Sequence, residues 1–318
     1  ASSVDTELII GRGGTGTLVV QGGGKVNVSG ASGDATIGQV AGSVGTATVT
    51  GAGSSWTTTG ALRVGLAGQG ALTVASGGTV TASSVVVGSL GTVHGDGTIV
   101  GAVQNSGIVA PGMSPGILHI TGSYTQTSTG QLQIELAGTT PGSQYDQLIM
   151  SGIIVLDGTL QVTTLNGFAP KALDRFNIFQ SGATPLTTFA TVNLPTLGSF
   201  LAWDQSQLYS GGLLSVISTL PGDYNRDGIV DAADYTVWRD SFGQSVADGT
   251  GADSDGDGMI TQSDYDFWVS QFGEIAGGGL GAGGGATAAV PEPPTAVLLS
   301  MALSFAGIGV AIDKRRRR

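Results

Sequence analysis

The sequence predicts a mainly β protein: a right-handed parallel β-helix (a solenoid), followed by a small all-α segment and a C-terminal transmembrane helix. Three observations lead to this prediction. A glycine-containing unit recurs through positions 1–220 of the 318-residue chain. Twelve of the 23 acidic side chains lie within residues 223–274. An apolar run followed by a basic cluster ends the chain.

The repeat places an aliphatic residue before a glycine at regular intervals. The pairs are Ile10-Gly11, Ile37-Gly38, Val64-Gly65 and Val87-Gly88. Short β-branched runs lie between glycine-rich turns, and such strands bury a core only when successive units stack. We expect coils of about 20–27 residues, with each strand pairing with its equivalent one coil away. Glycine suits the corners because it accepts positive φ.

Two alternatives compete with the β-helix. Disorder is excluded because apolar residues alternate regularly through the region. A β-sandwich stays open for residues 130–220, where the strands lengthen and the repeat fades.

Composition excludes several classes of site. The chain has 56 glycines, no cysteine and 11% charged residues, against about 25% charged residues in an average globular protein. Without cysteine there is no disulfide framework, thiolate zinc site, iron–sulfur cluster or cysteine nucleophile. Only His94 and His119 could supply imidazole chemistry. The net charge of −11 argues against a nucleic-acid partner.

Two catalytic motifs in the repeat region lack the context that their chemistry needs. Gly11–Gly16 matches G-x-G-x-x-G but precedes a strand rather than a helix. Gly112–Gly116 matches G-x-S-x-G but lacks the downstream acid and histidine in suitable places. We interpret both as coil corners, and we predict no enzyme. A further set is interpreted as solvated turn carboxylates: Asp34, Asp96, Glu135, Asp146 and Asp157.

The strings GTGTLVVQGGG, GAGSSWTTTGALRVG and GALTVASGGTV resemble the repeat of autotransporter passengers and of related exported proteins with a PEP-type C-terminus. The resemblance covers about residues 9–217. It implies a β-helical architecture. Because such passengers serve as adhesins, matrix components and enzymes alike, it implies no particular activity.

The acidic segment contains two loops with the spacing of calcium ligands. Each places oxygen-bearing side chains at positions 1, 3, 5, 9 and 12, has glycine at position 6 and offers a backbone carbonyl at position 7. Calcium takes six to eight oxygen ligands, and EF-hand-type loops supply them at these positions. We predict two Ca²⁺ ions, one held by Asp223, Asn225, Asp227, Ile229, Asp231 and Asp234, the other by Asp253, Asp255, Asp257, Met259, Thr261 and Asp264.

A matching amphipathic helix is expected after each loop. Tyr235, Trp238 and Phe242 fall on one face of the first helix, and Tyr265, Trp268 and Phe272 repeat that face in the second. Gly243 and Gly273 are expected to end the two helices.

GDYNRDGIVDAADYTVWRDSFG and DSDGDGMITQSDYDFWVSQFG resemble the duplicated segments of a type I dockerin, in which Asp at position 12 is ordinary. The resemblance implies a small calcium-dependent domain and a cohesin-like partner. It also implies partner contacts just before position 12, at Ala232, Ala233, Gln262 and Ser263. The alanine pair departs from the Ser-Thr pair common in that family. Without calcium, the like charges should leave the domain poorly folded.

The C-terminal residues predict a sorting signal or a membrane anchor. Pro291, Glu292 and Pro293, an 18-residue apolar run at 295–312 and the final basic cluster resemble a PEP-type (PEP-CTERM) sorting signal. Eighteen apolar residues just suffice to span a membrane, and the basic cluster favours a cytoplasmic C-terminus. The resemblance implies an exosortase-type processing enzyme; the alternative is a plain anchor. No signal peptide is visible before this exported chain, so we expect a truncated or trimmed precursor.

These observations predict a β-helix at 1–220, a dockerin-like domain at 221–274, a glycine-rich linker at 275–289 and a sorting or anchor segment at 290–318. The expected function is that of a structural or adhesive protein of the cell envelope, cell surface or extracellular matrix. The alternative is a polysaccharide-binding or polysaccharide-degrading protein recruited to an assembly. It predicts a carboxylate cluster or an aromatic groove on the β-helix.

Overall fold

The computed structural model describes residues 2–4 and 7–277. The described part divides into two compact units. Unit 1 comprises the residues up to Thr219 together with residues 276–277, and unit 2 comprises Leu220–Ile275. The predicted sorting signal and transmembrane helix, with Pro291, Glu292 and Pro293, lie outside the described residues.

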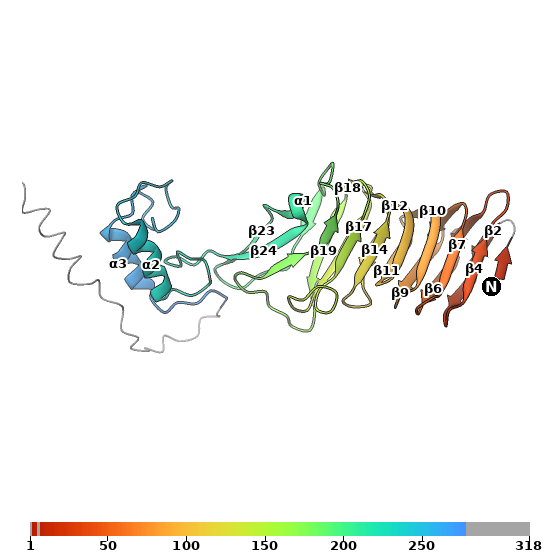
Figure 1. Ribbon diagram of the computed structural model, residues 1–318, viewed down its shortest axis with the longest axis horizontal. Coiled ribbons are helices and arrows are strands. Elements are labelled where there is room, and N and C mark those ends of the chain that lie inside the picture. The colour runs from red at the N-terminus through yellow and green to blue at the C-terminus, as the bar shows by residue number, and fades with distance from the viewer. Residues whose placement is uncertain (1, 5–6, 278–318) are drawn as a thin grey trace, which may run out of the picture. The chain divides into compact units, whose positions relative to one another are not determined.

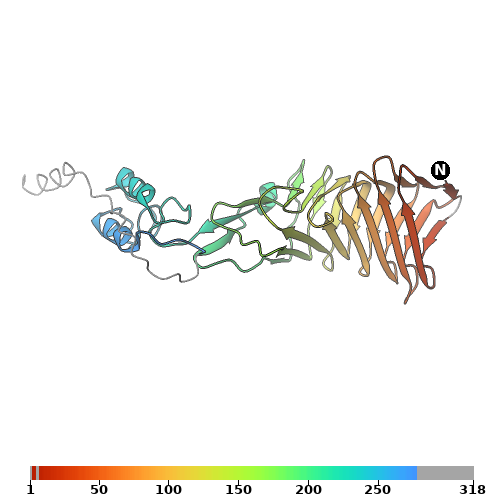
Figure 2. The ribbon, with the colours of Figure 1, turned by 90° about the horizontal axis from the view of Figure 1, so that it is seen from below.

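Unit 1 is built mainly from parallel strands in two sheets. The strands form three columns, and each strand pairs with one from the neighbouring coil, as Figures 1 and 2 show. The first column contains β1 (Ser2–Val4), β4 (Lys25–Val28), β7 (Ser55–Thr58), β10 (Thr79–Val87), β12 (Thr98–Asn105), β14 (Ile117–Thr121), β17 (Gln147–Met150) and β21 (Phe179–Ser181).

The second and third columns complete each coil. The second contains β2 (Glu7–Ile10), β5 (Asp34–Ile37), β8 (Ala61–Val64), the C-terminal halves of β10 and β12, β15 (Tyr124–Gln126) and β18 (Ile154–Val155). The third contains β3 (Thr15–Val20), β6 (Val44–Thr50), β9 (Gln69–Ala75), β11 (Gly91–Gly95), β13 (Ile108–Pro111), β16 (Gln131–Leu136), β19 (Thr159–Thr164) and β22 (Thr191–Asn193).

The core of unit 1 lies between the columns. Alternate residues of each strand point inward, and the burial alternates accordingly along β6, β8 and β16. Aligned inward residues form ladders, one of which runs Ile10, Ile37, Val64 and Val87. Trp56 is fully buried in such a ladder, between Val26 and Val80. Stacking of the coils therefore buries the apolar side chains that a single coil would expose.

Glycine corners allow the coils to approach closely. Gly11, Gly38 and Gly65 have φ values of 74°, 72° and 74°. A Cβ built at Gly65 would lie 2.3 Å from the backbone nitrogen of Gly91 in the next coil. Any side chain at this corner would separate the coils, so this part of the repeat requires glycine.

One inward ladder changes from apolar to polar residues. Asn105 follows Val87 in register, and Gln126 follows Asn105. Both are buried and hydrogen-bonded: the Asn105 amide donates to the Tyr124 hydroxyl at 3.1 Å, and Gln126 donates to the carbonyl of Asp157 at 2.7 Å. The two side-chain amides thus form hydrogen bonds with polar groups at the corners of the coils. Strand pairing alone leaves those groups without a partner.

The C-terminal end of unit 1 departs from the repeat. A three-stranded antiparallel sheet is formed by β20 (Arg175–Asn177), β24 (Leu213–Ser218) and β23 (Leu201–Asp204), and α1 (Leu208–Gly211) precedes β24. Phe176 of β20 packs edge-on against Tyr145, 5.5 Å between ring centroids. The sequence did not predict this sheet.

Coil length also varies more than the repeat predicts. The register shows the variation directly, because the coil that pairs Thr92 with Ile108 is about half as long as the coil that pairs Thr159 with Thr191. The short coils turn at glycines, and the long ones carry loops between the columns. The repeat therefore fixes the pairing of strands but not the length of chain between them.

Unit 2 contains two helices, α2 (Ala232–Ser241) and α3 (Gln262–Gln271). Their aromatic side chains form its core: Tyr235, Trp238, Tyr265 and Trp268 are buried and contact one another. Phe242 and Phe272 lie at the C-caps, beyond the helices, rather than on the predicted helical faces. Each still packs edge-on against the preceding tryptophan. Gly243 and Gly273 follow at positive φ, where the helices were expected to end.

Candidate metal centre

The two halves of unit 2 have the same local geometry. Asp231 and Thr261 are the N-caps of α2 and α3, and each forms a capping box with the residue three positions later, Asp234 or Asp264. The order of exposed and buried residues is identical along 231–240 and 261–270. The duplication seen in the sequence is therefore a duplication of structure.

The first loop curls around the carboxylate of Asp223, which is 6% exposed. The backbone amide of Asp227 donates to its Oδ1 at 3.1 Å, and that of Gly228 donates to its Oδ2 at 2.8 Å. The Asn225 side chain accepts from the amide of Asp227 and donates to its carboxylate, both at 2.9 Å. Positions 1, 3 and 5 are thus held together. Ile229, at position 7, is 41% exposed.

The second loop repeats this arrangement with more charge. Asp253 accepts from the amides of Gly256 and Gly258, at 2.9 and 3.0 Å. One carboxylate oxygen from each of Asp253, Asp255 and Asp257 lies within 4.8 Å of the other two. Three converging carboxylates repel one another, so the arrangement favours a bound cation. Met259, at position 7, is 39% exposed.

The position-12 carboxylates close the loops from the helix side. Asp234 and Asp264 have no solvent exposure. Asp234 accepts from the amides of Asn225 and Asp231, at 3.0 and 2.8 Å, and therefore links positions 3, 9 and 12. Burial raises the pKa of Asp234, and the negative charges of Asp223 and Asp227 add to this effect.

The donor set fits a hard divalent cation. Each loop offers carboxylate, amide or hydroxyl oxygens, which are the ligands that calcium prefers. The buried carboxylates lack a basic partner in the described part of unit 2, where Arg239 pairs with exposed Asp240 at 2.7 Å. A bound cation would supply the positive charge that buried carboxylates need beside them.

The two loops are joined by reciprocal contacts. The Trp238 indole donates to the carbonyl of Thr261 at 2.7 Å, and the Trp268 indole donates to the carbonyl of Asp231 at 3.1 Å. Each helix thus holds position 9 of the other loop. The Tyr224 hydroxyl adds a contact to Ser254 at 3.0 Å and donates to the carbonyl of Asp264 at 2.8 Å. These contacts were not predicted from the sequence, although the tryptophans recur at equal spacing.

Short backbone pairings reinforce the same symmetry. Val230 of the first loop exchanges hydrogen bonds with Gly273 and Glu274, which follow α3. Ile260 of the second loop exchanges equivalent bonds with Gly243 and Gln244, which follow α2. Each loop is therefore held by the segment beyond the opposite helix.

The residues predicted to contact a partner lie on the surface of unit 2. Ala232 and Ala233 lie in the first turn of α2, and Gln262 and Ser263 lie in the first turn of α3; none of the four is buried. They adjoin the N-caps Asp231 and Thr261, so their backbone positions depend on the loop geometry.

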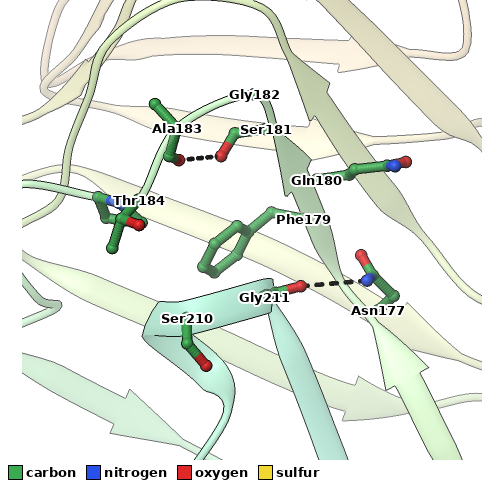
Figure 3. A pocket seen from close by; sticks show the side chains of 11 residues that line it. Asn177, Phe179, Gln180, Ser181, Gly182, Ala183, Thr184, Ser210 and Gly211 are labelled. Carbon is green, nitrogen blue, oxygen red and sulfur yellow. Dashed lines mark hydrogen bonds between the residues drawn. The ribbon is translucent and has the colours of Figure 1, made fainter.

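Unit 1 contains a hollow of about 310 Å³ at the C-terminal end of its strand columns. Figure 3 shows its lining, which includes Phe179 and the side chains of Ser181, Thr184 and Ser210. Asn177 donates to the carbonyl of Gly211 at 3.1 Å across one side. No charged side chain lines this hollow.

Among the described residues, no helix has the length and apolar character needed to cross a membrane.

Comparison with known proteins shows a similarity that covers most of the acidic segment. No curated protein and no solved structure matches the chain. Residues 221–268 match the family model of the dockerin type I domain. Type I dockerin domains bind calcium, and calcium is the cofactor of this segment. Dockerin domains bind cohesin partners, and the match suggests an extracellular or cell-surface protein. Residues 221–268 are similar to a type I dockerin domain, which supports calcium-dependent docking to a cohesin partner within an assembly.

Proposed function

We propose that this protein is an exported structural or adhesive component of the cell surface or extracellular matrix. Unit 1 acts as a right-handed parallel β-helix, and unit 2 docks it to a cohesin-like partner in the presence of calcium. The single observation that carries the docking proposal is the pair of equivalent loops, each with buried carboxylates at positions 1 and 12. The three strand columns, paired from coil to coil, support the β-helix.

Each loop of unit 2 is proposed to hold one Ca²⁺. The first would use side-chain oxygens of Asp223, Asn225, Asp227, Asp231 and Asp234 and the carbonyl of Ile229. The second would use Asp253, Asp255, Asp257, Thr261, Asp264 and the carbonyl of Met259. Bound calcium neutralises the converging carboxylates, and folding then becomes dependent on the ion. The chain's own capping boxes orient the position-12 carboxylates toward the loops.

The docking surface is proposed to include the first turns of α2 and α3, with Ala232, Ala233, Gln262 and Ser263. Calcium would act on this surface indirectly, by fixing the N-caps that precede these residues. The alanine pair makes the two halves chemically different, since the second half offers an amide and a hydroxyl.

The C-terminal residues are proposed to direct export. Residues 290–318, with Pro291, Glu292 and Pro293, would form a PEP-type sorting signal, and residues 295–312 would enter the membrane until an exosortase-type enzyme acts. The proposal rests on the resemblance of the sequence.

A polysaccharide-binding or polysaccharide-degrading role is a second candidate. The hollow in Figure 3 favours binding, because hydroxyl groups and the Phe179 side chain line it without charge. Ligand sites commonly combine apolar or aromatic walls with a few polar groups in this way.

Calcium titration of the full chain tests the docking proposal. We expect isothermal calorimetry to give two calcium ions per chain, and circular dichroism to show added helicity on binding. The double variant Asp223→Ala, Asp253→Ala should lose both signals, whereas Asp96→Ala in unit 1 should retain them. A calcium-loaded chain should then bind immobilised type I cohesins, and chelation should release it. Absence of calcium binding by the unchanged chain would remove the docking function.

A further inference from the structure

A second hollow, of about 300 Å³, lies on the outward side of the third strand column. Its lining comes from three coils: His94 on β11, Ala110 on β13, and Gln133 and Glu135 on β16. His94 and Ala110 are in register. β13 pairs with β16 through Val109 and Leu132, and Ala110 and Gln133 are the next residues along their strands. The small alanine between two longer side chains leaves space at the centre of the hollow.

Asp146 fixes one wall of this hollow. It is 1% exposed, and both of its oxygens accept from backbone amides: Oδ1 from Gly116 at 2.8 Å and Oδ2 from Glu135 at 2.9 Å. The Gly112–Gly116 segment, with Ser114 at a φ of 85°, is thereby held against β16. The interpretation as solvated turn residues was wrong for Asp34, Glu135 and Asp146. Asp34 and Glu135 lie on strands β5 and β16, and coil stacking buries Asp146. The G-x-S-x-G segment is a turn at the edge of a cavity.

The Glu135 carboxylate gives the hollow a negative charge. No lysine or arginine lines it. Burial lowers the pKa of His94, so the imidazole is neutral near pH 7 and adds no positive charge. The Glu135 side chain faces the hollow without a basic residue in its lining to pair with. Such a cavity disfavours acidic ligands and attracts cations.

The free polar groups of the hollow include acceptors. The Gln133 amide nitrogen donates to Gln131 Oε1 at 3.0 Å, which leaves the Gln133 carbonyl oxygen available. The His94 Nε2 is engaged with the Thr73 hydroxyl. Ser114 also lines the hollow, and its hydroxyl can donate or accept. An ammonium group has three donors and no acceptor, which suits the Glu135 carboxylate and the Gln133 carbonyl oxygen.

A bare metal ion fits less well. Within the described chain, His94, Glu135 and Asp146 do not form a group of converging ligand atoms like that of Asp253, Asp255 and Asp257. Both Asp146 oxygens also have backbone donors. The cavity, at the lower end of the size range for ligand sites, suits a small organic cation.

We propose that this hollow binds a protonated primary amine, seated against Glu135 and Gln133, of the kind carried by an amino sugar or a lysine side chain. His94 and Ala110 shape the floor of the site, and Asp146 is a positioning residue that holds the Gly112–Gly116 wall. This role belongs to unit 1 and goes beyond the proposed docking function of unit 2.

Nuclear magnetic resonance of the full chain in saturating calcium tests the proposal. Glucosamine at neutral pH should shift the side-chain amide signal of Gln133 and the imidazole signals of His94, and glucose should not. A lysine derivative with blocked backbone groups and a free ε-amine distinguishes the two kinds of amine. A site for an amino sugar should bind glucosamine more tightly, and a site for a protein lysine should bind the lysine derivative more tightly. Calcium signals from unit 2 serve as an internal reference, so failure here leaves the docking function untouched.

Two variants locate the site. Glu135→Gln keeps the shape and removes the charge, and it should weaken amine binding at least about tenfold. The same change at Glu7, on another column, should leave binding unchanged. If Glu135→Gln does not fold, Ala110→Leu fills the hollow without altering charge and should also abolish binding. Equal binding of glucose and glucosamine, or amine binding that survives both pocket variants, would overturn the proposal.

Discussion

The indole nitrogen of Trp238 donates a 2.7 Å hydrogen bond to the carbonyl of Thr261, the residue that caps the opposite helix and occupies position 9 of the opposite loop. Trp268 makes the equivalent bond to Asp231. Each helix of unit 2 therefore stabilises the loop that it does not follow. The two loops behave as one folding unit, because neither is held by its own half alone.

Replacing Trp238 by phenylalanine should weaken calcium binding at the second loop. The aromatic packing is largely kept, but the carbonyl of Thr261 loses its indole donor, which costs about 1 kcal/mol. Calorimetry should show a reduced affinity at one of the two sites. Trp56→Phe in unit 1 is a matched control, since the buried Trp56 indole nitrogen has no hydrogen-bond partner in the described structure. Equal effects of the two substitutions would argue against the cross-contact.

Asp264→Asn should reduce the calcium affinity of unit 2 by at least about tenfold, because a ligand charge is lost at position 12 of the more acidic loop. The asparagine oxygen can still accept from the backbone amide of Ser254, but its NH₂ group cannot accept from the backbone amide of Thr261 as Oδ2 of Asp264 does. The loss therefore reports both the missing charge and the missing capping contact. The expected readout is a melting temperature of unit 2 that depends less on calcium. Asp240→Asn, on the exposed face of α2, should leave that dependence intact.

Gly65→Ala should destabilise unit 1 by about 2 kcal/mol or more, because the alanine takes up a strained positive φ and its Cβ meets the backbone of Gly91. Denaturant unfolding followed by the β signal in circular dichroism measures the effect. Gly13→Ala is the control, because its added Cβ meets nothing within 4 Å. Similar losses at both positions would show that close coil approach is not the cause.

The contribution of Asp146 to the stability of unit 1 should fall as the pH rises from about 4 to about 7. Burial raises the pKa of Asp146 from 3.8 to about 7. Between these values the folded chain holds a proton that the unfolded chain has released, so raising the pH favours unfolding. Asp146→Asn should flatten this part of the pH profile, measured by denaturant unfolding in saturating calcium. An unchanged profile would mean that Asp146 is ionised in the folded chain at low pH.

Much of the architecture followed from local patterns. Gly11, Gly38 and Gly65 marked corners in the sequence, and all three adopt the positive φ that only glycine takes readily. The α2 and α3 segments and their glycine ends were predictable for a similar reason. Capping residues, helical spacing of aromatics and terminal glycines act within a few residues of each other.

The sequence by itself determined the parallel-strand class of unit 1, its glycine corners and the spacing of the oxygen-bearing side chains in the two loops, because each depends on residues close together in the chain. The tertiary structure decided which distant residues meet. Coil length varies along unit 1, so no fixed period could bring His94 and Glu135 to the same hollow or bury Asp146. The antiparallel sheet and the crossed tryptophan bonds also depend on three-dimensional packing, since their partners are joined by contacts that no local pattern encodes.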